Sequence, residues 1–160
     1  MRLFDPPYGA RILDVGGYVG ATAIHYASKG HRVTSIEGSP IYCAEFERNV
    51  AAAEVGDKIE LARCLFEEFR DPAAYDAACC TEVLNHVLDP QQVLRMIGTS
   101  LKPGGLVFVT TTQQMGHYDA RHYTRESLAE QLAAAGFRAD VELWADGQHT
   151  PQIVARGYCA

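Results

Sequence analysis

The sequence lacks long apolar runs, and none approaches the roughly 18 consecutive apolar residues that a membrane-spanning helix requires. The first fifteen residues also lack the apolar segment of a secretion signal. From these absences we expect a soluble, cytoplasmic protein with no membrane partner.

Cysteine shows none of the spacings that metal or redox sites need. The cysteines form no C-x-x-C pair, are odd in number and lie in or beside apolar runs. They are Cys43, Cys64, Cys79, Cys80 and Cys159. Reduced thiols of a cytosolic protein have this distribution. We therefore predict no metal or redox role for them.

Basic residues are too few for a broad phosphate-binding surface. The chain has 14 lysine and arginine residues against 20 aspartate and glutamate residues, a net charge of -6. A protein that holds nucleic-acid backbones on a basic face has the opposite balance, so we expect no nucleic-acid partner. The length of 160 residues is close to the commonest size of one domain. With no repeat and no linker, we expect a single domain over residues 1–160.

Strand-like and helical patterns alternate along the chain, as in proteins with a parallel sheet. Strands are predicted at residues 10–15, 31–36, 58–62, 74–80 and 106–112, and helices at 20–28, 40–53, 90–101 and 124–136. The sequence LKPGG at 101–105 predicts a turn, and the last helix has a Thr cap and ends on Gly. Two final strands, at 137–144 and 149–158, follow without a helix between them. They predict an antiparallel hairpin at one edge of the sheet.

The turn DVGGYVG after the first strand is a candidate ligand site, because open sheets bind ligands beyond the carboxyl ends of their strands. Gly16 and Gly17 allow the backbone to approach a ligand, and Gly20 can open the next helix close to the sheet. Asp14 can accept hydrogen bonds from a polar or cationic group, or brace the loop. The dinucleotide pattern G-x-G-x-x-G fails, because positions 18 and 21 hold tyrosine and alanine. Tyr18 would obstruct a pyrophosphate, so a nicotinamide-dependent oxidoreductase is disfavoured.

Glu37 follows the second strand, about twenty residues after the glycine loop. An acidic side chain at this point can accept hydrogen bonds from both hydroxyls of a ribose. Because the pyrophosphate pattern fails, the position indicates a nucleoside ligand. The alternative is that Glu37 is a helix-capping acid before Ser39 and Pro40.

Four segments in order resemble the successive signatures of the class I S-adenosylmethionine-dependent methyltransferases. They are ILDVGGYVG, VTSIEGSP, YDAACCTEVLNHVLDPQQVLRMIGTSLKPGGLVFVTT and HYTRESLAEQLAAAGF, and they cover almost the whole chain. The stretch from Tyr75 to Thr112 is especially similar to small-molecule methyltransferases of the broad ubiquinone-biosynthesis-like group. The resemblance implies an α/β fold, a Rossmann-like three-layer sandwich. Its seven-stranded, mostly parallel sheet would have the order 3-2-1-4-5-7-6, with strand 7 antiparallel.

The resemblance also implies S-adenosylmethionine as cofactor. The residues at positions that contact it in the family are Asp14, Gly16, Gly17, Tyr18, Gly20, Glu37, Gly38, Leu65, Phe66, Thr81 and Glu82. Those of the glycine loop would shape the pocket for the methionine part, and Glu37 would bind the ribose hydroxyls. Thr81 and Glu82 would line the pocket near the reacting methyl group.

Two positions depart from the family pattern. Most members have glycine where this chain has Tyr18. Many members also carry an acidic residue near Leu65 that contacts the adenine amine. Here Leu65 and Phe66 could only pack against the adenine ring.

Histidines are the candidate catalytic residues. Methyl transfer from a sulfonium depends largely on in-line positioning, and a base is required only for a hydroxyl or a protonated amine. The candidate bases are His86, which falls where the family often has histidine, His117 and His122, with Tyr118 and Tyr123 as polar pocket walls. The segment after the fifth strand that carries most of them should lie over the substrate side. The alternative for each histidine is a surface or structural role.

The letters DPPY at Asp5 to Tyr8 match the catalytic loop of enzymes that methylate the amino group of adenine. In those enzymes the loop must follow the fourth strand, at the ligand edge of the sheet. Here the letters precede the first strand, so they would lie at the opposite edge. We therefore interpret them as a rigid, extended lead-in.

We expect an S-adenosylmethionine-dependent methyltransferase that acts on an oxygen or nitrogen of a small-molecule substrate. The alternative is a non-catalytic methyltransferase-like binding module with a degenerate cofactor site. Only about ten residues precede the first strand, so the N-terminal helical lid of relatives is expected to be largely absent. A second copy or partner that closes the site, a large substrate, or a trimmed domain would each fit such an open site.

Overall fold

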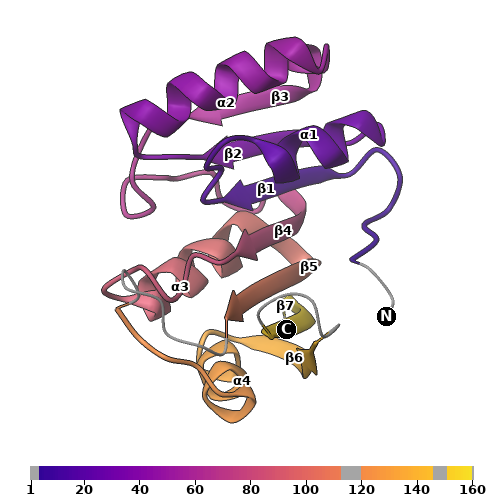
Figure 1. Ribbon diagram of the computed structural model, residues 1–160. Coiled ribbons are helices and arrows are strands. Elements are labelled where there is room, and N and C mark those ends of the chain that lie inside the picture. The colour runs from indigo at the N-terminus through magenta and orange to yellow at the C-terminus, as the bar shows by residue number, and fades with distance from the viewer. Residues whose placement is uncertain (1–3, 113–119, 146–150, 160) are drawn as a thin grey trace.

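The computed structural model describes residues 4–112, 120–145 and 151–159 (Figure 1). The strands are β1 (Arg11–Val15), β2 (Arg32–Ile36), β3 (Ile59–Ala62), β4 (Tyr75–Thr81), β5 (Leu101–Thr112), β6 (Phe137–Trp144) and β7 (Gln152–Cys159). The helices are α1 (Ala21–Ser28), α2 (Pro40–Ala52), α3 (Pro90–Ser100) and α4 (Arg125–Ala134), with a 3-10 turn at Gly56–Lys58. Within these ranges no helix is both long and apolar enough to cross a membrane. Strands and helices alternate along the chain, except that β4 directly follows β3 and β7 follows β6.

The strands form one seven-stranded sheet in the order β3-β2-β1-β4-β5-β7-β6. β1 pairs in parallel with β2 on one side and with β4 on the other. β7 pairs antiparallel with both β5 and β6. The predicted strand order and the predicted antiparallel hairpin at one edge are therefore confirmed.

Helices cover both faces of the sheet. Side chains on a strand alternate between the two faces, and here apolar side chains on both faces are buried under helices. Ile12 and Leu13 are neighbours on β1 and both are fully buried, yet they belong to different core clusters. Ile12 packs in the cluster that contains residues of α1 and α2, and Leu13 in the cluster that contains residues of α3 and α4. Cys79 and Cys80 on β4 divide in the same way. The result is the predicted three-layer sandwich.

The ends of the last two helices follow from their capping residues. At the start of α4 the Thr124 hydroxyl accepts the Ser127 N–H at 3.1 Å, and the Ser127 hydroxyl accepts the Thr124 N–H at 2.9 Å. Asp89 caps α3 by accepting the Gln92 N–H at 3.1 Å. Gly136, just after α4, has a φ of 87° in the left-handed region that favours glycine. The predicted Thr cap and Gly end of this helix are confirmed.

The turn predicted at 101–105 lies inside β5. This strand begins at Leu101, and residues 102–105 lie opposite Asp76 alone on β4. Gly104 has a φ of 73° within this bulge. The turn signal is therefore real, but it produces a bulge that lets the two strands continue to pair on either side.

The DPPY segment lies where the sequence predicts it. Tyr8 is 89% exposed, and its ring lies against Gly30, in the turn that precedes β2. That turn is at the amino ends of the parallel strands. The segment therefore lies at the opposite edge of the sheet from the carboxyl ends of β1 and β4.

Candidate functional site

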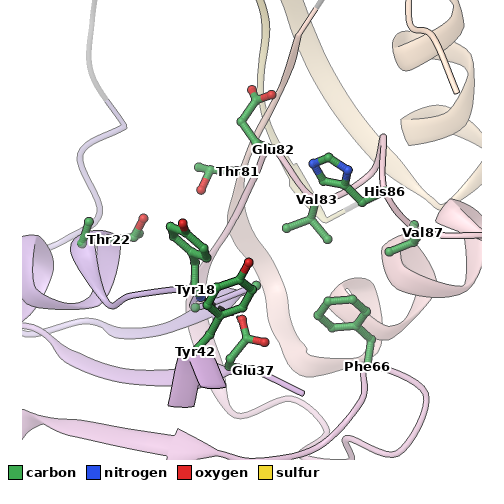
Figure 2. Close-up of a pocket in the computed structure, with 13 residues that line it drawn as sticks. Tyr18, Thr22, Glu37, Tyr42, Phe66, Thr81, Glu82, Val83, His86 and Val87 are labelled. Atoms are coloured by element: carbon green, nitrogen blue, oxygen red, sulfur yellow. Dashed lines mark hydrogen bonds between the residues drawn. The ribbon is translucent and has the colours of Figure 1, made fainter. Parts of the chain in front are cut away.

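A cavity of about 680 Å³ opens at the carboxyl ends of β1, β2 and β4. The strand order reverses between β1 and β4, which is where open α/β sheets bind ligands. Figure 2 shows the side chains around this cavity. The lining residues are Gly16, Gly17, Tyr18, Ala21, Thr22, Glu37, Tyr42, Phe66, Thr81, Glu82, Val83, His86 and Val87.

Backbone forms the wall of the cavity after β1. Gly16 and Gly17 donate their N–H groups to the carbonyl oxygen of Ile36, at 3.1 and 2.9 Å, which ties the loop to the end of β2. A β-carbon at Gly16 would collide with Val83, and one at Gly17 would collide with the Ser35 hydroxyl. Gly16 also has a φ of 80°, which favours glycine. Only glycine therefore fits at these two positions without a shift of their neighbours.

Glu37 is held at the cavity wall by two backbone groups. Its Oε2 accepts the Tyr18 N–H at 2.9 Å, and its Oε1 accepts the Ser39 N–H at 2.7 Å. Ser39 is the N-cap of α2, so Glu37 does contact the helix start as the capping interpretation predicts. Each carboxylate oxygen has a further lone pair. The same side chain can therefore brace the loop and accept hydrogen bonds from a ligand.

Asp14 lies on β1, fully buried, and is not among the lining residues. Its Oδ2 accepts a hydrogen bond from the Ser35 hydroxyl at 2.7 Å, and its Oδ1 has no hydrogen-bond partner among the described residues. Burial raises the pKa of Asp14 to about 7; the Ser35 hydrogen bond opposes the rise and the nearby charge of Glu37 adds to it. The carboxyl group therefore changes its charge near neutral pH.

Because of Asp14, the free energy of unfolding should fall as the pH rises from about 4 to about 7. In this range the unfolded chain has lost the Asp14 proton while the folded chain keeps it, because the folded pKa is raised from 3.8 to about 7. The contribution is on the order of 4 kcal/mol. The Asp14→Asn variant lacks this ionisation. Denaturant titration measures the free energy of unfolding of the variant and of the wild type. The difference, variant minus wild type, should be larger at pH 8 than at pH 5.

The control for this measurement is Asp57→Asn, at an exposed position in the 3-10 turn. In this variant the loss of stability that Asp14 causes with rising pH should still be present. If Asp14→Asn and wild type differ by the same amount at pH 5 and pH 8, the raised pKa of Asp14 is contradicted.

The opposite wall of the cavity comes from β4 and the segment after it. Glu82 has a φ of 56°, and its N–H donates to the Thr110 carbonyl oxygen at 2.9 Å. The Thr110 hydroxyl donates to Glu82 Oε1 at 3.0 Å. His86 lies on the same wall, with its Nε2 atom 3.3 Å from Asn85 Nδ2. Glu82 and His86 therefore both line the cavity from one segment.

Most of the residues predicted for the site are brought together here. Those that line the cavity are Gly16, Gly17, Tyr18, Glu37, Phe66, Thr81, Glu82 and His86. The remaining predicted cofactor residues, Asp14, Gly20, Gly38 and Leu65, are not among the lining residues. Gly20 packs over Phe46, and Leu65 is 56% exposed with its side chain against Gly38. Contacts with a cofactor stay predictions for all of the predicted cofactor residues, whether or not they line the cavity.

The described part of the segment after β5, residues 120–124, contributes no lining residue to the cavity. His122 is exposed and is not among the lining residues. Tyr123, predicted as a pocket wall, is instead 1% exposed in the core, with its hydroxyl 3.4 Å from the Leu84 carbonyl oxygen. His117 and Tyr118 lie outside the described residues. Catalytic roles for His86, His117 and His122 stay predictions.

Several lining residues were not predicted. They are Ala21, Thr22, Tyr42, Val83 and Val87. Val83 and Val87 lie within a quoted signature but carry no polar group that would have marked them. Tyr42 is in the first turn of α2, where only the packing of that helix decides which side chain meets the cavity.

No group of three or more His, Cys, Asp or Glu side chains that could hold a metal ion occurs in residues 4–112, 120–145 and 151–159. The cysteines are free thiols, and burial raises the pKa of Cys79 and of Cys80 above its usual value. Thiolates are therefore disfavoured on β4.

Comparison with known proteins identifies the family. A family model described as a methyltransferase domain matches residues 1–142 of this chain. The chain belongs to the class I S-adenosylmethionine-dependent methyltransferases. The resemblance carried by the four sequence segments is thus confirmed, and S-adenosylmethionine is the cofactor of this methyltransferase family.

The curated relatives of this chain include enzymes named for ubiquinone biosynthesis. The ubiquinone biosynthesis O-methyltransferase of Xylella fastidiosa is 34% identical over 146 residues, which cover 90% of this chain and 54% of the relative. The enzyme of the same name from Aeromonas salmonicida is 37% identical over 108 residues, 65% of this chain and 44% of the relative. The chain spans about half the length of the curated relatives it matches.

Solved structures share the fold at lower identity. The 1,6-didemethyltoxoflavin-N1-methyltransferase of Burkholderia thailandensis, solved with 1,6-didemethyltoxoflavin and S-adenosylhomocysteine, has a TM-score of 0.82 at 23% identity. The match covers 96% of this chain and 72% of that chain. The cyclase SpnF also has a TM-score of 0.82, at 21% identity, covering 94% of this chain and 75% of its own. At these identities the likeness concerns the fold alone.

Proposed function

We propose that this chain transfers a methyl group from S-adenosylmethionine to an oxygen or nitrogen of a small-molecule substrate. The observation that carries the proposal is Glu37, a carboxylate fixed between the glycine loop and α2 and facing a cavity at the reversal of strand order. A volume of about 680 Å³ is within the usual range for small-molecule sites. The cavity therefore has the size and the position expected for a cofactor with its substrate.

The residues present fit S-adenosylmethionine. Glu37 would accept hydrogen bonds from the ribose hydroxyls through lone pairs that Tyr18 and Ser39 leave available. Gly16 and Gly17 offer bare backbone, which would lie along the methionine part. When bound, the cofactor supplies a methyl group on a positively charged sulfur. Phe66 would pack against the adenine ring from the other side of the cavity.

The acceptor would bind on the wall formed by Thr81, Glu82 and His86. Transfer from a sulfonium needs a nucleophile in line with the methyl group, so these side chains would contribute mainly by holding the acceptor in place. His86 is the candidate base, because its ring lies at the cavity and can take the proton that a hydroxyl or ammonium acceptor must lose. Thr110 would position Glu82 through the hydrogen bonds described above.

The names of the relatives support either acceptor atom. The enzymes of Xylella fastidiosa and Aeromonas salmonicida are named as O-methyltransferases, and the Burkholderia thailandensis enzyme as an N1-methyltransferase. The cyclase SpnF has a similar fold but is named for a different reaction, so the fold alone does not determine the reaction. We propose a small metabolite as substrate, the cytoplasm as location and a second copy or partner as the cover of the site.

Calorimetric titration with S-adenosylmethionine and with S-adenosylhomocysteine tests the proposal. We expect both ligands to bind with micromolar dissociation constants, at one site per chain. A panel of phenols and amines, incubated with the protein and S-adenosylmethionine, should then yield S-adenosylhomocysteine with at least one acceptor. No binding of either ligand would contradict the proposal and favour a methyltransferase-like module without a cofactor.

A further inference from the structure

Two tyrosine rings meet at the cavity next to Glu37. Tyr18 comes from the glycine loop and Tyr42 from the first turn of α2, and both line the cavity. Their ring centroids are 4.5 Å apart, with an interplanar angle of 63°. Figure 2 shows the two rings together beside the Glu37 carboxylate. Tyr18 is 55% exposed and Tyr42 is 41% exposed, so both rings have free faces for a ligand.

Tyr18 adopts a backbone conformation that a tyrosine rarely adopts. Its φ is 46°, in the left-handed region, which is costly for a residue with a bulky side chain. The conformation is held by the hydrogen bond from the Tyr18 N–H to Glu37 Oε2. A half-exposed ring contributes little to the core, so stability does not account for tyrosine at this position. Strain of this kind is concentrated at binding sites and points to a ligand.

The surroundings of the tyrosine pair favour a cation. The cavity lining contains two carboxylates, Glu37 and Glu82, and no lysine or arginine occurs among the lining residues in the described part of the chain. The faces of aromatic rings attract positive charge at distances up to about 6 Å. The pair is therefore suited to a small positively charged group.

The position of the pair relates it to one atom of the cofactor, and this step rests on the proposed function. If Glu37 accepts hydrogen bonds from the ribose hydroxyls, the sulfur, which is bonded to the 5′ carbon of the same sugar, lies about one sugar ring beyond those hydroxyls. The Tyr18 N–H contacts the same carboxylate at 2.9 Å. The sulfonium of S-adenosylmethionine is positively charged, whereas the sulfur of S-adenosylhomocysteine is neutral.

We propose that Tyr18 and Tyr42 form an aromatic pair that recognises the sulfonium and makes the site prefer S-adenosylmethionine over S-adenosylhomocysteine. The two rings alone produce this preference for S-adenosylmethionine, so it does not depend on which acceptor substrate is bound. A cation over an aromatic ring changes affinity by about 2-fold to 30-fold, depending on how far the pair is desolvated. The pair would thus favour release of the product after each transfer.

The test is the ratio of the dissociation constants of S-adenosylhomocysteine and S-adenosylmethionine, measured by calorimetry. Tyr18→Leu and Tyr42→Leu keep an apolar side chain but remove the aromatic face, and each should lower the ratio several-fold. Tyr18→Phe keeps the face and should keep the ratio. Tyr8→Leu, at the opposite edge of the sheet, is the matched control and should behave like the wild type.

Two outcomes would overturn the inference, and they are distinct. If both leucine variants bind the two ligands with an unchanged ratio, the tyrosines do not sense the charge on sulfur, even though the cofactor site is real. If the wild-type chain binds neither ligand, the proposed function fails, and the inference fails with it.

Discussion

Replacing Glu37 with alanine is expected to weaken the binding of S-adenosylhomocysteine by about 100-fold or more. A hydrogen bond to a charged group contributes about 1.5–3 kcal/mol, and the carboxylate is positioned to accept two from a ribose. Every 1.4 kcal/mol corresponds to a factor of ten in affinity. The variant also frees the Tyr18 and Ser39 N–H groups, which loosens both sides of the cavity. Calorimetric titration of the variant and the wild type gives the ratio directly.

Two further variants test whether the effect comes from the charge of Glu37 or from the loss of any nearby carboxylate. Glu37→Gln keeps the shape of the side chain and one acceptor oxygen, so it should bind more weakly than the wild type and more tightly than Glu37→Ala. Glu45→Ala removes an exposed carboxylate of α2 that pairs with Arg48, and it should leave ligand affinity unchanged. An unchanged affinity in Glu37→Ala would show that this carboxylate does not face the ribose.

Replacing Leu94 with alanine is expected to lower the free energy of unfolding by about 2–5 kcal/mol. Leu94 is fully buried on α3, in the core cluster between the sheet and the helices α3 and α4. The substitution removes apolar contacts and leaves a cavity that its neighbours fill only in part. Denaturant unfolding at a fixed pH measures the loss.

Leu88 offers a matched control for Leu94 a few residues earlier in the chain. It is 90% exposed, so Leu88→Ala should change the free energy of unfolding by no more than about 0.5 kcal/mol. A small effect of Leu94→Ala would contradict the packing of α3 against the sheet.

The strands and helices follow closely from the sequence because their signals are local, whereas the strand order was implied by the resemblance to the methyltransferase family. The β-branched and apolar run at β2 and the apolar run at β4 are buried strands, and Thr124 and Asp89 fix the starts of two helices. The bulge at Gly104 could not be predicted in the same way. The Pro-Gly-Gly letters specify a tight bend, whereas only the pairing of β5 with β4 shows that the strand continues through it.

The site residues also differ in whether local sequence signals or tertiary packing determine their positions. Gly16, Glu37 and Thr81 follow or end strands, so the strand order alone brings them to one edge. Tyr42 lies on a helix, and its direction depends on how α2 packs against the sheet. The segment of His122 and Tyr123 is rich in polar groups, but composition does not determine direction, and the Tyr123 ring turns into the core.

The two adjacent cysteines of β4 place one thiol in each of the two core clusters, so each cluster can be probed chemically. Cys79 belongs to the cluster under α1 and α2, and Cys80 to the cluster under α3 and α4, and both are buried. Because both sulfurs are almost fully buried, a thiol-specific reagent should react with each one mainly when the structure opens locally on its own side of the sheet. Labelling rates at these two neighbouring positions therefore report separately on the local opening of the two layers.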